Sequence, residues 1–486
     1  MGGTVAAAVR RGVSDGGSLS GLAVAFGSAQ VRLGLLVVAS LMMAACTRGP
    51  APPDPTVLGT VDPAVRSLLD QHTAAVREAP SNADRWGTLG MAYEANGFTA
   101  PAREAYRTAT SFENDHGRWW YRLAILAQRE GDTDAALAAF DRAIALSPDM
   151  VAARWRRGLL LLDRGDLDAA EAAFRVAANL APNDSAGVTG LARVLMARGH
   201  ADQAATRLEA LLEQAPADRY AYQLLGAAYR TLGRQAEAAD AMAAGAGGEP
   251  EWTDPWSDEV GSLRRGFASS LKDATSLAMA GRYGESIALL ERLRAERPDD
   301  RELRTYLGGV YASAGRVAEA RTLLEAALAA HPDDFDATMH LATAHLFASD
   351  YAAATRVVDG ALALRPASPE ATRLRGVIAW RAGRLDDARR DLEAAAGADP
   401  RDAKVVAWLG AIARERGRAD EALDAYRRAL GRDPLLVDAL VGGAAAGLDA
   451  GARDEAARWL ARARRLAPGD SRVAELERRV KIGGRS

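Results

Sequence analysis

A period of 34 residues, marked by proline, runs through most of this 486-residue chain. The prolines in this register are Pro148, Pro182, Pro216 and Pro250, then after one slip Pro298, Pro332, Pro366, Pro400, Pro434 and Pro468. Because the chain has only 19 prolines, ten in one register indicate a repeat. A period of this length is typical of a solenoid in which helix–turn–helix units stack on their neighbours. The spacing therefore predicts an all-α, elongated interaction scaffold.

The unit at residues 117–150 shows how each repeat is expected to fold. Apolar residues such as Trp120 and Leu123 share one face of a first helix. Gly131 follows as its stop, because glycine readily adopts the left-handed conformation that closes a helix. A second apolar stripe precedes Pro148, which prevents the second helix from continuing. Two antiparallel helices per unit follow from this pattern.

These units resemble the tetratricopeptide repeat, whose pattern sets Trp, Leu, Gly, Tyr, Ala, Phe, Ala and Pro at fixed positions of 34. The first unit matches it with Trp86, Leu89, Gly90, Tyr93, Ala102, Tyr106 and Ala109. Eleven units begin at Ala83, Gly117, Val151, Ser185, Arg219, Phe267, Arg301, Phe335, Pro369, Ala403 and Val437. Position 15 is glycine in ten of them, with Ser349 as the exception, and position 20 is alanine in ten, with Ser286 as the exception. The resemblance implies a right-handed superhelical solenoid of about eleven helix–turn–helix units.

Both ends of the repeat region are predicted to be capped, as a stack of repeats requires. One helix is expected over residues 65–78 and a polar helix over residues 471–481. The predicted division is a signal region at 1–45, a lipidated cysteine and proline-rich tether at 46–62, an N-terminal array of a cap helix and five repeats at 63–252, an inserted short helix or linker at 253–266, and a C-terminal array of six repeats and a capping helix at 267–486.

The N-terminus has the pattern of a targeting segment. Residues 33–43 are apolar, follow Arg32 and precede two alanines, as in a secretory signal. The run is too short to span a membrane as a helix. Small residues followed by Cys46 resemble the bacterial lipobox, which implies that Cys46 is the lipid attachment site. The alternative is a cleaved soluble signal with an incidental cysteine.

Three further expectations concern this region. Residues 1–30 are too long and too weakly charged for an ordinary signal start, so translation is expected to begin near Val31. The proline-rich residues 47–62 are expected to form a semi-rigid spacer. By resemblance to Gram-negative lipoproteins, Thr47 after the cysteine implies a lipoprotein of the outer membrane that faces the periplasm.

The period slips between the fifth and sixth units. A short helix is expected over residues 255–264, because Asp254 can cap it and Pro255 suits its first turn. Trp252 and Trp256 flank the start of this helix. Two interpretations stay open: the indoles fill a gap where the stacking is broken, or the insert is a hinge or an aromatic docking site.

No motif for catalysis or metal binding occurs, and the six histidines form no ligand pattern. Eleven units and the insert fill residues 83–470, which leaves no room for a catalytic domain. We therefore expect no enzyme activity, no catalytic residue, no metal and no cofactor. A net charge of −3 and a pI near 6.2 argue against nucleic acid as a partner.

In tetratricopeptide repeats, positions 2, 5, 9, 12 and 13 line the concave face. Carried over to units 2 to 5, they give a predicted partner-binding groove that is basic and aromatic: Arg118, Tyr121, Arg129, Trp155, Arg193, Tyr220 and Arg230. Arginine and aromatic side chains favour extended or helical protein segments with acidic and apolar residues. Anionic glycan is the rival ligand, since the same side chains suit it.

Together these patterns predict a lipid-anchored scaffold of the bacterial envelope that takes part in assembling an envelope or export machine. The alternative is a regulator of a cell-wall or polysaccharide-synthesis enzyme.

Overall fold

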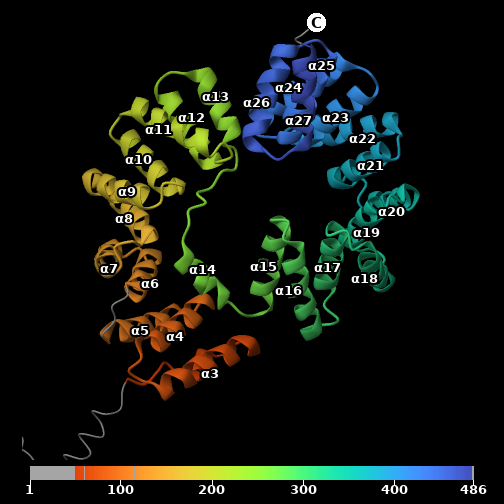
Figure 1. Cartoon of the computed structure of the whole chain (residues 1–486). Helices are drawn as coiled ribbons and strands as arrows, with labels where there is room; N and C mark the ends of the chain where they lie inside the picture. Colours follow the sequence, from red (N-terminus) through yellow and green to blue (C-terminus); the bar gives the residue numbers. More distant parts are fainter. Residues whose placement is uncertain (1–49, 60, 113–116, 484–486) are drawn as a thin grey trace, which may run out of the picture.

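The computed structural model describes residues 50–59, 61–112 and 117–483, and the regular elements among them are all helices (Figure 1). Residues 1–49 lie outside the described residues, and with them the predicted signal region and Cys46. No helix within the described ranges is long and apolar enough to cross a bilayer. A short 3-10 helix, η2 (Pro55–Leu58), lies in the predicted tether.

The N-terminal array consists of a cap helix and five helix pairs. Its helices are α3 (Pro63–Glu78), α4 (Ala83–Ala95), α5 (Thr99–Ser111), α6 (Arg118–Arg129), α7 (Thr133–Leu146), α8 (Val151–Arg164), α9 (Leu167–Leu180), α10 (Ser185–Ala197), α11 (Ala201–Gln214), α12 (Arg219–Thr231) and α13 (Gln235–Ala244). A single short helix follows, α14 (Pro255–Ser262), capped by Asp254 as the sequence predicts.

The C-terminal array contains six helix pairs and a final helix. They are α15 (Phe267–Met279), α16 (Tyr283–Glu296), α17 (Arg301–Ser313), α18 (Val317–Ala330), α19 (Phe335–Phe347), α20 (Tyr351–Leu364), α21 (Pro369–Arg381), α22 (Leu385–Ala398), α23 (Ala403–Glu415), α24 (Ala419–Arg432), α25 (Val437–Asp449), α26 (Arg453–Leu466) and α27 (Ser471–Gly483).

The predicted repeat register agrees with these helices. Ten of the eleven predicted unit starts are the first residues of helices, and α6 begins one residue late, at Arg118. All ten glycines at position 15 have φ between 73° and 87°, and Ser349 has φ 59°. Each first helix therefore ends on a left-handed residue, the conformation that glycine adopts without steric cost. This requirement explains why position 15 is nearly invariant within the chain.

Close packing inside each unit explains the alanine at position 20. The ten alanines are at most 3% exposed, and Ser286 is fully buried. Its hydroxyl donates a hydrogen bond of 2.7 Å to the carbonyl oxygen of Ala274, which satisfies the extra polar atom. Gly90 shows the same constraint, since a Cβ there would lie 2.6 Å from the ring of Tyr106. The two helices of a unit thus leave room only for small side chains.

The helix pairs form the predicted solenoid, but the second array does not extend the first as an elongated scaffold would, because the two fold back into an open ring (Figure 1). After α13 the chain returns along the inner side of the N-terminal array, and α14 packs against α4. Gly266 then lies close to the start of α3, where a Cβ would be 3.7 Å from atoms of Asp62 and Val65. The sixth unit therefore starts beside the N-terminal end of the first array, because the insert reverses the direction of the chain.

The far ends of the arrays meet where α13 approaches α24. Arg219, at the start of α12, forms a two-pronged ion pair with Asp433, whose carboxylate oxygens lie 3.1 and 2.9 Å from its Nη2 atom. Both side chains remain partly exposed. This contact closes the ring opposite α14.

A candidate site on the inner face

Residues 245–266, here called the linker segment, run along the inner face of the N-terminal array from the fifth unit to the first. Near its beginning, Gln223 of α12 donates hydrogen bonds of 2.9 and 2.8 Å to the carbonyl oxygens of Gly245 and Gly248. Near its end, Asn96 donates a 3.2 Å hydrogen bond to the carbonyl oxygen of Leu263. The linker segment is therefore tied to the array at both ends and runs antiparallel to the order of the repeats.

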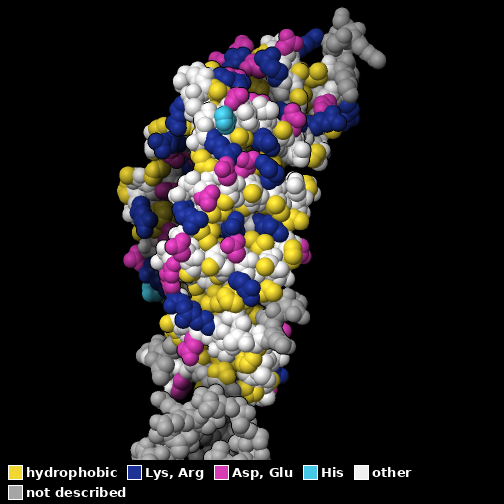
Figure 2. Space-filling model, turned by 90° about the vertical axis from the view of Figure 1, so that its left-hand side faces the viewer, with side chains coloured by type: hydrophobic (Ala, Val, Ile, Leu, Met, Phe, Trp, Pro, Cys, Tyr) yellow, Lys and Arg dark blue, Asp and Glu magenta, His cyan; other side chains and the backbone are white. Residues whose placement is uncertain are grey.

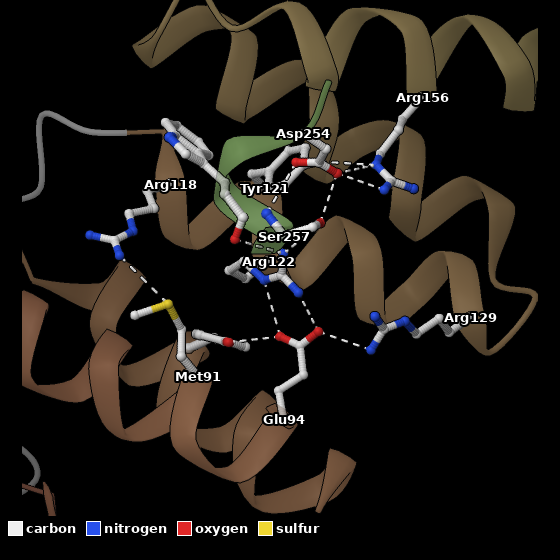
Figure 3. Close-up of polar contacts among 11 residues, drawn as sticks. Met91, Glu94, Arg118, Tyr121, Arg122, Arg129, Arg156, Asp254 and Ser257 are labelled. Carbon is white, nitrogen blue, oxygen red and sulfur yellow. Dashed lines mark hydrogen bonds and ion pairs between the residues drawn. The ribbon is translucent and has the colours of Figure 1, made fainter. Parts of the chain in front are cut away.

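Asp254 is the most strongly held side chain of the linker segment (Figure 3). The hydroxyl of Tyr121 donates to its Oδ2 atom at 2.6 Å, and Arg156 donates from Nη2 and Nε at 2.6 and 3.0 Å. Ser257 adds a hydroxyl donor at 2.7 Å and its backbone N–H at 3.1 Å. Only 7% of Asp254 is exposed. The inner face thus recognises one carboxylate with a full set of donors.

The ionisation of this cluster follows from its contacts. Burial raises the pKa of Asp254, but hydrogen bonds from Tyr121 and Ser257 and the charge of Arg156 outweigh burial and lower it below the ordinary 3.8. Burial raises the pKa of Tyr121 well above its usual range, and the neighbouring Asp254 carboxylate adds to that effect. Asp254 is therefore a carboxylate and Tyr121 a neutral donor throughout the physiological pH range.

Aromatic side chains hold the linker segment on either side of Asp254. The ring of Trp252 lies 5.0 Å from that of Trp155 and 5.9 Å from that of Tyr220, both in edge-to-face geometry. The ring of Trp256 lies 5.4 Å from Tyr121, also edge to face. The two indoles therefore pack onto units 2, 3 and 5 rather than filling a gap between units 5 and 6. Of the two interpretations left open by the sequence, the filled gap is therefore wrong, because the sixth unit is not stacked on the fifth.

A buried ion-pair network lies beneath α14 (Figure 3). Glu94 of α4 accepts hydrogen bonds from Arg122 Nε at 3.0 Å, from the Tyr106 hydroxyl at 2.7 Å and from Arg129 Nη1 at 2.9 Å. The Arg122 and Glu94 side chains are only 1% and 2% exposed. Arg122 also donates to the hydroxyl of Ser257 at 3.2 Å. Arg122 therefore joins the core of units 1 and 2 to the linker segment.

Four of the seven predicted groove residues contact the linker segment: Arg118, Tyr121, Trp155 and Tyr220. Arg118 does so through an ion pair with Glu259. The other three lie on the first helices of their units but keep accessible side chains: Arg129, Arg193 and Arg230. Arg193 is 3.8 Å from Asp163, and Arg230 is exposed near the end of α12.

The sequence prediction missed Arg122, Arg156 and Glu94. Both arginines occupy position 6 of their units, which was not among the positions carried over from the family. Glu94 lies at position 12 of unit 1, outside the predicted groove of units 2 to 5. A usable signal was present, since consecutive units place arginine at the same position beside the aromatic residues Tyr121 and Trp155.

The C-terminal array has a separate hollow between α21, α23, α25 and α27. Its volume is about 760 Å³, and its lining includes Trp380, Trp408, Arg381 and Arg414. Arg414 is already paired with Asp449 at 2.7 Å. Among the residues that the structure describes, no group of three or more histidine, cysteine or acidic side chains is placed to hold a metal.

The outer flank of the N-terminal array differs from its inner face. Figure 2 shows this flank, where acidic and basic side chains are interspersed with apolar ones. No large field of one sign stands out in that view. Selective recognition of a charged segment is therefore better supported on the inner face, where arginine, tyrosine and tryptophan side chains surround one carboxylate.

Two family models, both described as tetratricopeptide repeat, match the chain. One matches residues 121–185, 376–437 and 409–471, and the other matches 161–229, 277–346 and 312–378. Together they extend over well more than half of the sequence. A search of curated proteins found no match.

Several solved structures align with parts of the chain. A thermophilic tetratricopeptide repeat protein of Thermus thermophilus is 25% identical with a TM-score of 0.36, and covers 38% of this chain and 100% of its own. PilW, a type IV pilus biogenesis factor, is 17% identical with a TM-score of 0.39 and covers 43% of this chain and 97% of its own. YrrB, described as having an unusual peptide-binding site, is 16% identical with a TM-score of 0.31, and covers 39% of this chain and 97% of its own. The family models and the repeat geometry show that the chain belongs to the tetratricopeptide repeat family.

Proposed function

We propose that this protein is a lipid-anchored scaffold of the bacterial envelope that binds protein segments on the inner face of its N-terminal array and helps to assemble an envelope or export machine. Tetratricopeptide repeat proteins are interaction scaffolds. One observation carries the binding proposal: the inner face holds an acidic, aromatic segment of its own chain through Tyr121, Arg156 and Trp155.

The chemistry of these contacts favours protein over anionic glycan as the ligand. Arg122 approaches the backbone carbonyl oxygen of Trp256 at 3.5 Å, and Gln223 binds two further carbonyl oxygens of the linker segment. Donors to main-chain carbonyls suit an extended polypeptide. The arginines add planar recognition of carboxylates, and the aromatic rings add contact area at low entropic cost.

Anchoring is supported by the sequence of residues 32–46 alone. An apolar run, two small residues and Cys46 stand in the order that lipidation requires, and the proline-rich tether would keep the ring away from the bilayer. Cys46→Ser should move the protein from the membrane fraction to the soluble periplasmic or secreted fraction. Labelled palmitate should enter the parent but not the variant. Equal fractionation of the two, with no label in the parent, would exclude the anchor.

Partner binding is best tested with groove arginines that the linker segment does not use. Arg193→Glu with Arg230→Glu reverses two charges on first helices and leaves the Glu94 network intact. Arg175→Glu with Arg207→Glu, on the second helices α9 and α11, makes the same change in charge on exposed side chains. Partners co-purified from envelope extracts should be lost in the first variant and kept in the second. Retention of every partner in both variants would reject this face.

A further inference from the structure

The linker segment is bound in the manner of a ligand rather than of a plain connection between domains. Its recognition centres on the pattern Trp252-Thr253-Asp254-Pro255-Trp256, in which the carboxylate lies between two indoles. Both indoles and the carboxylate point into the inner face. A connector needs only sufficient length, whereas here three side chains of one short motif make specific contacts with the array.

The part of the inner face that binds this motif contains buried hydrogen-bond donors without an acceptor. The indole N–H of Trp155 is buried without a hydrogen-bond partner, although only 5% of that residue is exposed. The Nε atom of Arg118 is also buried and unpaired. Buried donors normally have an acceptor. A segment that placed a carbonyl or carboxylate oxygen near these donors would therefore bind better than the linker segment does.

Open space adjoins the motif. A hollow of about 800 Å³ lies between Thr253, Pro255 and Trp256 on one side and Met150 and Asp184 on the other. A second hollow of about 490 Å³ adjoins Thr253 from the direction of the fifth unit. The linker segment therefore leaves room along its edge where an incoming segment can make its first contacts.

The bound form of the linker segment depends on the inner face. Helix α14 has only eight residues, and a helix of that length is not stable alone in water. Of the linker segment only Gly245, Asp254 and Val260 are buried, and Trp252, Trp256 and Leu263 are partly buried, so fewer buried contacts hold this segment than hold the repeat helices. Segments with few buried contacts open at low cost relative to the rest of a fold. The linker segment is thus the part of this region that can leave while the repeats stay folded.

We propose that the linker segment is a built-in competitor for the binding face, and that the natural partner presents the same chemistry: an acidic residue between two aromatic residues in an extended stretch that leads into a short helix. This inference rests on the function proposed above and adds the chemistry of the partner. The partner binds where Asp254, Trp252 and Trp256 now lie and displaces them. Because the competitor is tethered, it acts at a high effective concentration and sets a threshold for partner binding.

A labelled peptide of residues 249–265 is the probe. Its affinity for the full chain, purified in detergent, is measured by fluorescence anisotropy. The parent should bind weakly, and Trp252→Ala with Asp254→Asn should bind at least tenfold more tightly because the tethered competitor is weakened. Asp258→Asn, which changes an exposed carboxylate of α14, should bind the peptide as weakly as the parent does. Adding Arg156→Glu to the weakened variant should abolish binding.

Equal affinity of the parent and the weakened variant would overturn the proposal, since the linker segment would then not compete. If the weakened variant loses its helical circular dichroism, hydrogen exchange of the parent decides. Excess peptide should speed exchange in α14 and leave α6 and α8 protected, and unchanged protection of α14 would overturn displacement. A doubled mass by light scattering would place the segment in a second copy, which also overturns it.

The competitor proposal and the scaffold proposal can be rejected independently of each other. If the parent and the weakened variant bind the peptide equally, but the Arg193 and Arg230 variant loses its partners, the competitor proposal is rejected and the scaffold proposal stands. Peptide binding without any loss of partners would keep the linker segment as a ligand of this face but reject the face as the site of the co-purified partners.

Discussion

At the scale of single residues, the backbone conformation at position 15 explains why glycine recurs there in the sequence. Every first helix of a unit is followed by a residue with positive φ, and ten of these eleven residues are glycine. Ser349 adopts the same conformation with a side chain present, at φ 59°. For a residue with a Cβ this conformation costs roughly 1–2 kcal/mol. One unit of the C-terminal array therefore carries a strained turn.

Ser349→Gly should relieve that strain. We expect the free energy of unfolding to rise by about 0.5–1 kcal/mol, because part of the gain is offset by the greater freedom of glycine in the unfolded chain. Gly383→Ser, at φ 75° in the next unit, is the reverse change and should destabilise by a similar amount. Urea denaturation of both variants provides the measurement, and a destabilised Ser349→Gly variant would contradict the argument.

Asp254 should make the binding of the linker segment depend on pH. Its folded-state pKa is lower than its unfolded value, so the stability that it contributes is present above about pH 4 and is lost as pH falls through the folded-state pKa. Asp254→Asn should cost roughly 1.5–3 kcal/mol at neutral pH, because hydrogen bonds to a charged group are lost. The difference between variant and parent in urea denaturation should shrink below about pH 4. A stability difference between variant and parent that grows at low pH would contradict the lowered pKa of Asp254.

At the scale of elements, each unit depends on close packing between its two helices. Ala136 of α7 is fully buried at such a contact, whereas Ala138 of the same helix is exposed. The repeating alanine thus sets the distance between paired helices. Units stacked in this way depend mainly on their neighbours for stability.

Ala136→Trp should overpack the contact between α6 and α7 and lower the free energy of unfolding by roughly 1–3 kcal/mol. Ala138→Trp adds the same side chain to the same helix on its exposed side and should have little effect. Thermal and chemical denaturation of the two variants give the comparison. Equal stability of both would mean that the assigned face of α7 is wrong.

The sequence predicted the helices well because the determinants of each unit are local. The positive-φ residue, the small residue at position 20 and the proline all lie within 34 residues of one another. The surface that the linker segment contacts could not be predicted in this way. Asp254 contacts Tyr121, which is 133 residues away, and no periodic pattern relates the two. The sequence marked Trp252 and Trp256 as unusual but gave no indication of the face against which they pack.

At the scale of the whole molecule, the ring is held by unequal contacts. The linker segment joins the arrays on one side through a buried carboxylate and several aromatic rings. On the other side, Arg219 and Asp433 form a partly exposed ion pair, a class worth about 0.2–1 kcal/mol. The ring should therefore open at the contact between α13 and α24 before the linker segment detaches.

Arg219→Glu should open the ring by placing two carboxylates against each other. The radius of gyration from small-angle X-ray scattering should increase, and 1 M salt should increase that of the parent by screening the pair. Arg175→Glu, the same change on the outer side of α9, should leave the parent dimensions unchanged. Helical circular dichroism should stay constant in both variants. A radius unaffected by either Arg219→Glu or salt would show that other contacts close the ring.

The order of the chain gives the linker segment one more consequence, which concerns biosynthesis. Residues 118–230, which form the inner face, reach the compartment where the protein folds before Trp252 and Asp254 do, and repeats can fold as they emerge. The first acidic, aromatic stretch that the finished face meets in the same molecule is therefore its own continuation. A chain arranged in this way covers its binding face with its own linker segment before other polypeptides can occupy it.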